Sequence, residues 1–391
     1  MKLRRAVENL RQSGPLLRDG AKSGNLRVLA TLLGPAFRGL IAQRGRDEDS
    51  TVLDGGAGVH FDWRYLRDQP QMSRLYETAK QSQWNASTDV DWTHDVDPER
   101  FQLLPDELLP VAELSVWRKL DANEKRKQRY ALLSWMLSQF LHGEQGALYA
   151  ATQVTEAVPW LDAKLYGATQ VMDEARHVEV FHRYLTDKLG KLYEIDDNLY
   201  VVIDALMTDS RWDLKFLGMQ IMVEGLALGA FGTLRQITDE PLLREVLKYV
   251  ITDEARHVHY GVLALKEVYA KLIDERERRD REDWAFEMSL LLRNRFLAHE
   301  VYDEFYGHAM SRDTWDKLLL DSELMRLFRR TMFKRIIPNL KRIGLLSERV
   351  RPHYAELGLL DYESGPAAPE ITARDLLDDD AQVARVAQTS R

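Results

Sequence analysis

The pentapeptide Asp-Glu-Ala-Arg-His occurs twice in this chain, at Asp173–His177 and at Asp253–His257. Each copy contains Glu-x-x-His, and positions i and i+3 of a helix share one face. Each copy is also preceded, 30 residues before its own Glu, by one carboxylate in an apolar helical setting: Glu144 and then Glu224. The sequence therefore offers four carboxylates and two imidazoles in a repeated pattern.

This set of donors suits two divalent or trivalent metal ions. Buried carboxylates are very costly unless cations or protons neutralise them, and carboxylates with imidazoles suit iron or manganese. We predict two iron ions, with Mn/Fe or Mn/Mn as alternatives. The two Glu-x-x-His glutamates would bridge the metals, the upstream glutamates would be terminal, and each ion would take one histidine. The predicted metal-binding and catalytic residues are Glu144, Glu174, His177, Glu224, Glu254 and His257.

The alternative is structural coincidence, because a single Glu-x-x-His on a helix is common and a helical Glu usually faces water. Repetition with identical flanks and equal spacing argues against coincidence. The upstream glutamates also lie in the apolar runs 140–149 and 219–231, where a solvated Glu is out of place.

The residues around each Glu-x-x-His predict support for the histidines. A metal-bound histidine usually donates its other N–H to a carboxylate. Asp173 and Asp253 are the candidates, each reaching the histidine of the opposite helix pair, with Arg176 and Arg256 balancing their charge. The alternative is a pair of ordinary i,i+3 salt bridges.

Long helices must position these residues. The pattern becomes strongly helical near residue 123 and predicts five long helices, at about 123–153, 160–188, 211–237, 240–272 and 277–308. A shorter helix is expected near 196–208, and one or two more over 313–344, with Pro338 as a kink or break. Strand signals are nearly absent. The fold class is therefore all-α, and the 80-residue repeat is a helix pair used twice, as in a four-helix bundle with additional helices.

The remaining segments differ in composition. Residues 1–48 form a basic arm, expected to be solvated and partly helical, with contact to a membrane or an acidic partner as the alternative. Residues 49–122 predict an irregular segment that wraps the bundle, with Trp63, Trp84 and Trp92 as packing anchors. The bundle and its accessory helices occupy 123–345. Residues 346–391 form a tail, expected to be disordered from Gly365.

Composition limits the function classes. The 391 residues include no cysteine, which excludes disulfides, cysteine–zinc sites and iron–sulfur clusters held by this chain. The net charge of -8 gives no reason to expect nucleic acid as a partner. No apolar run approaches the roughly 18 residues of a membrane span, and no secretory signal follows the basic start, so we expect a cytoplasmic protein.

The order of the six residues resembles that of the ferritin-like di-iron carboxylate superfamily, over about residues 123–272. With Asp and Arg in the flanks, the motif is most similar to multicomponent monooxygenase hydroxylases and acyl-carrier-protein desaturases. It is also similar to arylamine N-oxygenases and the ribonucleotide reductase small subunit. The resemblance implies a ferritin-like bundle and an oxygenase, hydroxylase or desaturase that uses O2 on a small organic substrate. Electrons would come from a separate ferredoxin or flavin reductase.

Several positions depart from these relatives. Phe181 stands where the reductase subunit has its radical tyrosine, and Met219 where related ligand-binding oxidases cross-link a tyrosine. Val250 replaces an extra histidine of the arylamine N-oxygenases. Ala227 and Leu228 occupy the turn in which monooxygenases and desaturases place a threonine. We therefore interpret the chain as a branch of its own.

The glycines around the two upstream glutamates, at 143, 146, 225 and 229, indicate either close helix packing or space for O2 and substrate. Such a cavity favours a substrate with an apolar or aromatic part, and its expected lining is Ala147, Leu148, Phe181, Ala227, Leu228 and Gly261. The alternative functions are an iron-handling ferroxidase or peroxide-detoxifying ferritin-like protein, and an N-oxygenase of an aryl amine. A homodimer stays open.

Overall fold

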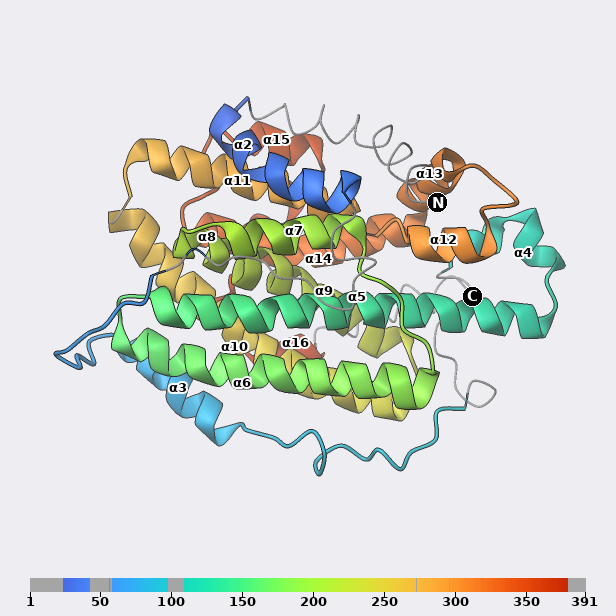
Figure 1. The fold of residues 1–391 in the computed structure, drawn as a ribbon, viewed down its shortest axis with the longest axis horizontal. Helices are drawn as coiled ribbons and strands as arrows, with labels where there is room; N and C mark the ends of the chain where they lie inside the picture. Colours follow the sequence, from blue (N-terminus) through green and yellow to red (C-terminus); the bar gives the residue numbers. More distant parts are fainter. Residues whose placement is uncertain are drawn as a thin grey trace.

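Four long helices lie side by side at the centre of the molecule (Figure 1). They are α5 (Ala122–Ala157), α6 (Leu161–Arg183), α9 (Glu224–Ile237) and α10 (Pro241–Lys271). The computed structural model describes residues 24–42, 56, 58–97, 109–271, 273–294 and 296–378, and every regular element within these ranges is helical. The prediction of an all-α fold built on a four-helix bundle with additional helices is confirmed for the described residues.

Local sequence signals set the ends of these helices. The side chain of Asp121 accepts a hydrogen bond from the backbone N–H of Glu124 and caps α5. At its other end α5 stops at Ala157, directly before an extended Val158 and Pro159. The chain continues after α6 as a π-helical segment, η4 (Tyr184–Leu189), which ends at Gly190 with φ of 61°. The tight α5–α6 connection makes the two helices antiparallel neighbours.

The helix that carries Glu224 is interrupted in its hydrogen-bonding pattern. α8 (Trp212–Phe216), the π-helical segment η5 (Leu217–Val223) and α9 follow one another without a break, so the wider turns end directly at Glu224. A π-helical turn changes which face the following residues present, and such turns are frequent at functional sites. All seven residues of η5 are buried.

This same stretch, Trp212–Ile237, is the one helix among the described residues with the length and composition of a membrane span. In the structure, 94% of its most apolar window is buried inside the bundle. Its apolar character is therefore accounted for by packing against the other central helices.

Accessory helices cover the core on one side. α7 (Asp197–Thr208), α11 (Glu275–Asn294) and α14 (Glu323–Arg342) pack against the central helices, with α12 (His299–Phe305) and α13 (Arg312–Asp321) at one end (Figure 1). The prediction of one helix over 277–308 is wrong. The break lies before α12, where Ala298 has a left-handed backbone with φ of 46°. Pro338 lies inside α14 without ending it.

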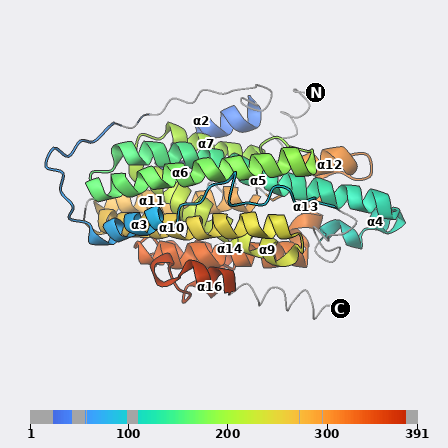
Figure 2. The same ribbon diagram turned by 90° about the horizontal axis from the view of Figure 1, so that it is seen from below.

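The N-terminal segment partly meets its prediction. Residues 24–42 form α2 (Leu26–Ala36) and a π-helical end, η1 (Phe37–Ile41), which pack on α7, while α3 (Pro70–Gln81) packs on α6 and α10 (Figure 2). Trp84 and Trp92 are buried anchors, as predicted, but Trp63 is 75% exposed and anchors nothing. Residues 1–23 and 43–48 of the predicted basic arm lie outside the described residues.

The C-terminal segment is ordered further than the sequence predicted. After α15 (Arg351–Glu356) and η6 (Leu360–Tyr362), the chain forms η7 (Ala368–Glu370) and α16 (Ala373–Asp378), both packed on α10. Leu376 is buried, and the backbone N–H of Ala368 donates to Asn339 Oδ1 at 2.8 Å. The prediction of disorder from Gly365 is therefore wrong for residues 365–378, and residues 379–391 lie outside the described residues. Two short helices, η3 (Pro110–Glu113) and α4 (Ser115–Lys119), precede α5.

Candidate metal centre

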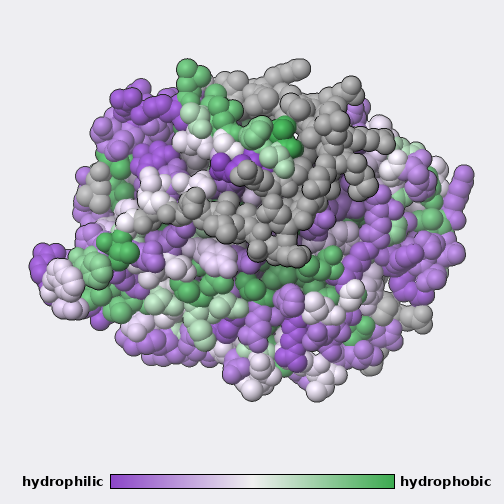
Figure 3. Space-filling view, viewed as in Figure 1, coloured by the Kyte–Doolittle hydropathy of each residue, from purple (hydrophilic) through white to green (hydrophobic). Residues whose placement is uncertain are grey.

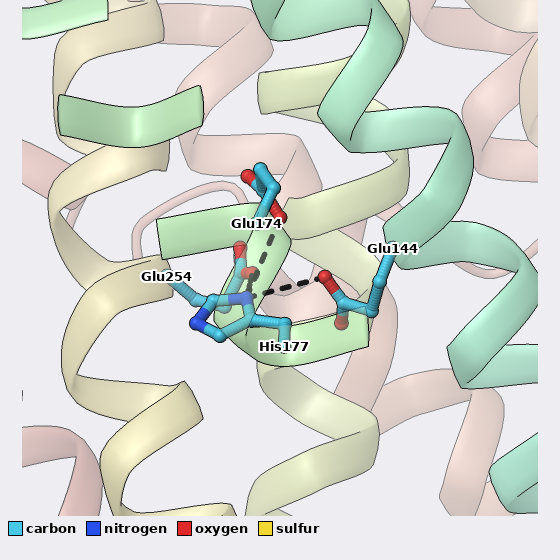
Figure 4. Close-up of side chains that lie close together, drawn as sticks. All are labelled: Glu144, Glu174, His177 and Glu254. Atoms are coloured by element: carbon cyan, nitrogen blue, oxygen red, sulfur yellow. Dashed lines mark hydrogen bonds and ion pairs between the residues drawn. The ribbon is translucent and has the colours of Figure 1, made fainter. Parts of the chain in front are cut away.

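The structure brings all six predicted ligands together inside the bundle. α5 and α9 each contribute one glutamate, and α6 and α10 each contribute a glutamate and a histidine. Figure 4 shows four of the six, Glu144, Glu174, His177 and Glu254. None of the six is more than 5% exposed. Their ligand atoms form two overlapping groups in which all atoms lie within 4.8 Å of one another, and Glu174 belongs to both groups: Glu144, Glu174, His177 and Glu254; Glu174, Glu224 and His257.

Both histidines point the same ring nitrogen into the cluster. Nδ1 of His177 lies 3.2 Å from Glu144 Oε2, and Nδ1 of His257 lies 3.0 Å from Glu174 Oε1. The two ring centroids are 5.9 Å apart. Each imidazole therefore offers Nδ1 to the centre and keeps Nε2 for another partner.

The glutamate of each Glu-x-x-His motif lies close to both histidines. Oε2 of Glu174 lies 3.4 Å from Nδ1 of His177, and its Oε1 faces His257. Oε1 of Glu254 lies 3.2 Å from Nδ1 of His177, and its Oε2 lies 3.5 Å from Nδ1 of His257. One oxygen toward each histidine is the arrangement that bridging carboxylates need. The bridging roles of these two residues stay a prediction that this geometry fits.

The aspartates of the pentapeptides reach across the bundle. Nε2 of His177 lies 3.2 Å from Asp253 Oδ2, and Nε2 of His257 lies 3.1 Å from Asp173 Oδ2. Each aspartate therefore holds the histidine of the opposite helix pair, as the sequence predicted. This contact fixes the orientation in which Nδ1 faces the cluster.

Two arginines complete this network. Arg176 contacts Asp173 on its own helix and lies 3.6 Å from Asp253, while Arg256 contacts Asp253 and lies 3.3 Å from Asp173. The i,i+3 salt bridges that the sequence offered as an alternative are present, but they are part of a buried network of four residues. The arginines also donate to the aspartates that accept from the histidines.

The wrapping segment supplies two partners that the sequence reasoning did not find. Nε1 of Trp84 donates to Asp253 Oδ2 at 2.8 Å, and its ring stacks on Tyr249 with centroids 4.7 Å apart. Gln83 donates to Asp173 Oδ1 at 3.4 Å. No spacing rule links these residues to aspartates that lie 90 and 169 positions further along the chain.

Two buried glutamines were also missed. Nε2 of Gln170 donates to Glu174 Oε1 at 3.2 Å and to Glu224 Oε1 at 3.1 Å, and it joins ligands from two helices. Gln220 lies one turn before Glu224 and approaches Gln170 with an N–O distance of 3.5 Å. Each lies one turn before a ligand on an apolar face, and that signal was available in the sequence.

Burial sets the protonation of the upstream glutamates. It raises the pKa of Glu144 and Glu224 well above the ordinary glutamate value, and the charge of Glu254 raises both further. Burial acts in the same direction on Glu174, but His257 and His177 outweigh it and hold the pKa of Glu174 below its ordinary value.

The pKa values of the two histidines are raised by the carboxylates around them. Burial would lower the pKa of His177, but its contacts with Asp253 and Glu144 raise that pKa well above the ordinary value. The charges of Glu174 and Glu254 do the same for His257. The raised pKa values of the histidines and the upstream glutamates thus favour bound protons in the metal-free chain, at the place where cations would sit in a metal site.

The residues present fit a pair of metal ions. Several ligand atoms are buried without any hydrogen-bond partner: Glu174 Oε2, Glu224 Oε2, both carboxylate oxygens of Glu254, and Nδ1 of His257. An unpartnered buried polar atom costs about 1–3 kcal/mol, and more when it is charged. Since all these atoms face one centre, cations bound there would satisfy them together.

The departures from the better-known relatives are apolar and buried in the structure. Phe181, Met219 and Val250 have no exposed surface, and Leu228 is 6% exposed. Phe181 belongs to a group of three phenylalanines, with Phe231 at 5.7 Å and Phe140 at 6.0 Å between ring centroids. None of these positions brings a hydroxyl or a third imidazole to the cluster.

An apolar cavity of about 100 Å³ lies further along the bundle, between α5, α9, α12 and α13. Phe140, one turn before Glu144, forms part of its wall, and its ring meets Phe231 edge-on at 4.7 Å. None of the six residues expected from the sequence to line a cavity lines this one. Gly261, one of those six, instead packs so tightly that an added Cβ would come 2.8 Å from Gln220 Cβ.

The glycine beside Glu144 also serves close packing. A Cβ at Gly146 would come 2.9 Å from the side chain of Ile203 on α7. The sequence left two explanations open for these glycines, close helix packing or space for O2 and substrate. The contact at Gly146 supports close helix packing. An added Cβ at Gly143, in contrast, meets nothing within 4 Å.

Comparisons with known proteins find similarity to solved structures alone, at low sequence identity. No protein-family model matches the sequence, and no curated protein matches it. Among solved structures, an R2-like ligand-binding oxidase with aerobically reconstituted metal cofactor after photoconversion matches with a TM-score of 0.47 and 19% identity, covering 70% of this chain and 93% of that one. A mutant of such an oxidase with anaerobically reconstituted Mn/Fe cofactor matches with a TM-score of 0.41 and 20% identity, covering 66% and 92%.

Proposed function

We propose that this chain is a di-metal oxidoreductase that uses O2 to oxidise an organic substrate with an apolar or aromatic part. The observation that carries the proposal is the buried cluster of four glutamates and two histidines, whose unpartnered atoms face one centre. Two iron ions are the expected occupants, with Mn/Fe or Mn/Mn as alternatives.

The protein side of the chemistry follows from the geometry. Glu174 and Glu254 would hold both metals, while Glu144 and Glu224 would each bind one. Bound iron or manganese would supply the redox chemistry with O2. Gln170, hydrogen-bonded to both Glu174 and Glu224, limits how these carboxylates rotate. The aspartate–arginine network keeps the imidazoles oriented through any change in metal charge.

The apolar cavity supports the expected class of substrate. Its polar wall residues are already partnered: Gln128 accepts from Tyr306, Gln139 bonds backbone groups near residue 195, and Thr233 bonds Gly229. The cavity therefore presents mainly apolar atoms to an occupant. Phe140 lines this space and lies one helical turn before Glu144, so α5 carries both a wall residue of the cavity and a candidate ligand.

The cavity also bears on the alternative functions. A ferroxidase or peroxide-detoxifying protein handles small polar species and has no use for an apolar cavity in the same bundle as its metals. An N-oxygenase of aryl amines would use such a cavity. However, arylamine N-oxygenases have an extra histidine at the position that Val250 occupies in this chain. We therefore place oxidation of an apolar organic substrate first. Electrons would come from a separate donor, a ferredoxin or a flavin reductase.

The first experiment measures metal and oxygen together. Protein loaded anaerobically should contain about two iron or manganese ions per chain, and the chemically reduced protein should consume O2. Glu174→Ala should lose the metals, because Glu174 belongs to both ligand groups. One metal or none after full loading would reject the site, and two metals without O2 consumption would reject the oxidase. Iron oxidation in the presence of every tested organic compound, with no organic product, would favour the ferroxidase.

The second experiment tests the cavity. Val301 lines it on α12 and is buried. Val301→Phe should fill part of the space and slow turnover of an identified substrate, while metal content and O2 reactivity without substrate stay unchanged. Unchanged turnover would remove the cavity from the proposal.

A further inference from the structure

The charge of this chain is divided unevenly along the sequence. Residues 1–46 contain ten Lys or Arg against two Asp or Glu, which leaves 44 of the 54 basic and 60 of the 62 acidic residues for the rest. The N-terminal segment is therefore strongly cationic on a chain that is anionic overall. Such a contrast points to an anionic partner for this segment.

The described part of this segment has an apolar face toward solvent. Leu26, Leu33 and Phe37 are 79%, 57% and 61% exposed. At 100° per residue, positions i, i+7 and i+11 lie within about 20° of one line along a helix. Figure 3 shows the hydrophobic side chains of this part standing on the outer surface, over the helix labelled α2 in Figure 1.

The opposite face of the same helix is firmly attached. Val28, Pro35 and Gly39 lie about half a turn away from the exposed line and are buried. A Cβ at Gly39 would come 2.8 Å from Val201 on α7. A surface helix normally presents polar residues on its solvent side, but here both the attached and the free faces are apolar.

Ion pairs hold the helix in this orientation. Arg38 donates to both oxygens of Asp204 on α7, at 2.7 Å and 2.6 Å. Asn25 and Arg27, at the other end, donate to Asp280 on α11 at 2.9 Å. With anchors at both ends, turning the apolar line inward would break these contacts.

We propose that α2 and η1 form a docking surface for an anionic lipid membrane. An apolar line preceded by basic sequence is the pattern of a helix that lies in the membrane interface, where apolar side chains enter the lipid and cations attract anionic headgroups. Six Lys or Arg precede the helix within residues 1–23. Arg44 and Arg46 follow it but are succeeded directly by Asp47, Glu48 and Asp49, so the excess of basic residues lies on the N-terminal side. A membrane contact would also place an apolar substrate near the protein, although the docking does not depend on the proposed oxidase function.

Other occupants fit less well. A second copy of this chain docked on the same face would bring two cationic segments together, and like charges oppose that contact. An acidic protein would satisfy the charge but gives no reason for the exposed leucines to align along one side. The membrane accounts for the charge and for the apolar line at once.

The test is co-sedimentation of the full chain with vesicles. Vesicles of equal parts phosphatidylglycerol and phosphatidylcholine should bind the protein, and vesicles of phosphatidylcholine alone should bind it much more weakly. Leu33→Asp and Phe37→Asp should each weaken binding by about tenfold or more, because each removes apolar surface from the lipid and adds a negative charge. Raising the salt to 1 M should weaken it further, since the Debye length falls to about 3 Å.

The matched control is Leu192→Asp, the same change at a leucine that is 50% exposed elsewhere. It should leave vesicle binding unchanged, and all variants should keep the melting temperature of the parent. Absence of binding to anionic vesicles, or equal loss in the Leu192 variant, would overturn the proposal. Sedimentation velocity of the same samples identifies the rival: a dimer lost on Leu33→Asp would assign this face to a second copy. None of these readouts requires bound metal.

Discussion

The crossed aspartate–histidine contacts make a sharp prediction for Asp253→Asn. Asp253 uses both oxygens: Oδ1 contacts Arg256, and Oδ2 accepts from Trp84 at 2.8 Å and lies 3.2 Å from Nε2 of His177. An asparagine keeps the shape but has one acceptor oxygen. If that oxygen stays with His177 and Trp84, the amide NH2 faces Arg256, donor against donor.

Asp253→Asn should change two quantities, the free energy of unfolding and the affinity for metal. Losing one charge-assisted hydrogen bond lowers the free energy of unfolding of the metal-free chain by about 1.5–3 kcal/mol. Weaker orientation of His177 lowers affinity for the metal that it binds by about 10–100-fold, as is usual when a partner of a metal-bound histidine is changed. Since His257 keeps Asp173, the second metal should bind with nearly the affinity of the parent.

Anaerobic titration with Fe2+ against a competing chelator resolves the two binding steps, and urea unfolding measures stability. Asp173→Asn is the symmetric control and should weaken the metal bound by His257 instead. Asp187→Asn, which alters an exposed i,i+4 pair with Arg183, should change neither quantity. A stability loss at Asp253→Asn with metal affinity changed less than threefold would refute the crossed support and leave only the salt bridges.

Three further outcomes are expected. Trp84→Phe keeps the stacking on Tyr249 but removes the indole N–H that donates to Asp253, so urea unfolding should show a loss of about 1–2 kcal/mol, and an unchanged midpoint would contradict the bond. Gln170→Met leaves Glu174 Oε1 and Glu224 Oε1 without that donor, which should destabilise the metal-free chain by about 1–3 kcal/mol, an effect that metal loading should reduce. Free metal at a hundred times its dissociation constant should stabilise the folded chain by about 2.7 kcal/mol, seen as a higher melting temperature that Glu174→Ala abolishes.

The ligand positions could be predicted because they follow from helical periodicity and from the repeat. Glu174 and His177 share a helix face whatever surrounds them, and the second copy confirms the pattern by its equal spacing. The crossed contacts of the aspartates also follow, because antiparallel neighbours bring the two copies face to face. These features depend on local geometry and on one packing rule.

Other features depend on the path of the chain in three dimensions. Trp84 reaches Asp253 only because an irregular segment folds over the bundle, and no period in the sequence encodes that path. Trp63 and Trp84 were both expected to be packing anchors because they are tryptophans in the same irregular segment, yet Trp63 is exposed. None of the residues expected to line a cavity lines the apolar cavity, because glycine serves close packing and open space alike, and Gly146 and Gly261 serve packing.

The crossed contacts also give the site an approximate symmetry. Asp173 serves His257 and Asp253 serves His177, so neither helix pair can orient its own histidine. Two identical copies of one helix pair, related by a two-fold axis, would satisfy both histidines and supply all six ligands. The six ligands and the two aspartates are thus arranged with the approximate two-fold symmetry of a dimer within a single polypeptide, and neither helix pair is complete without the other.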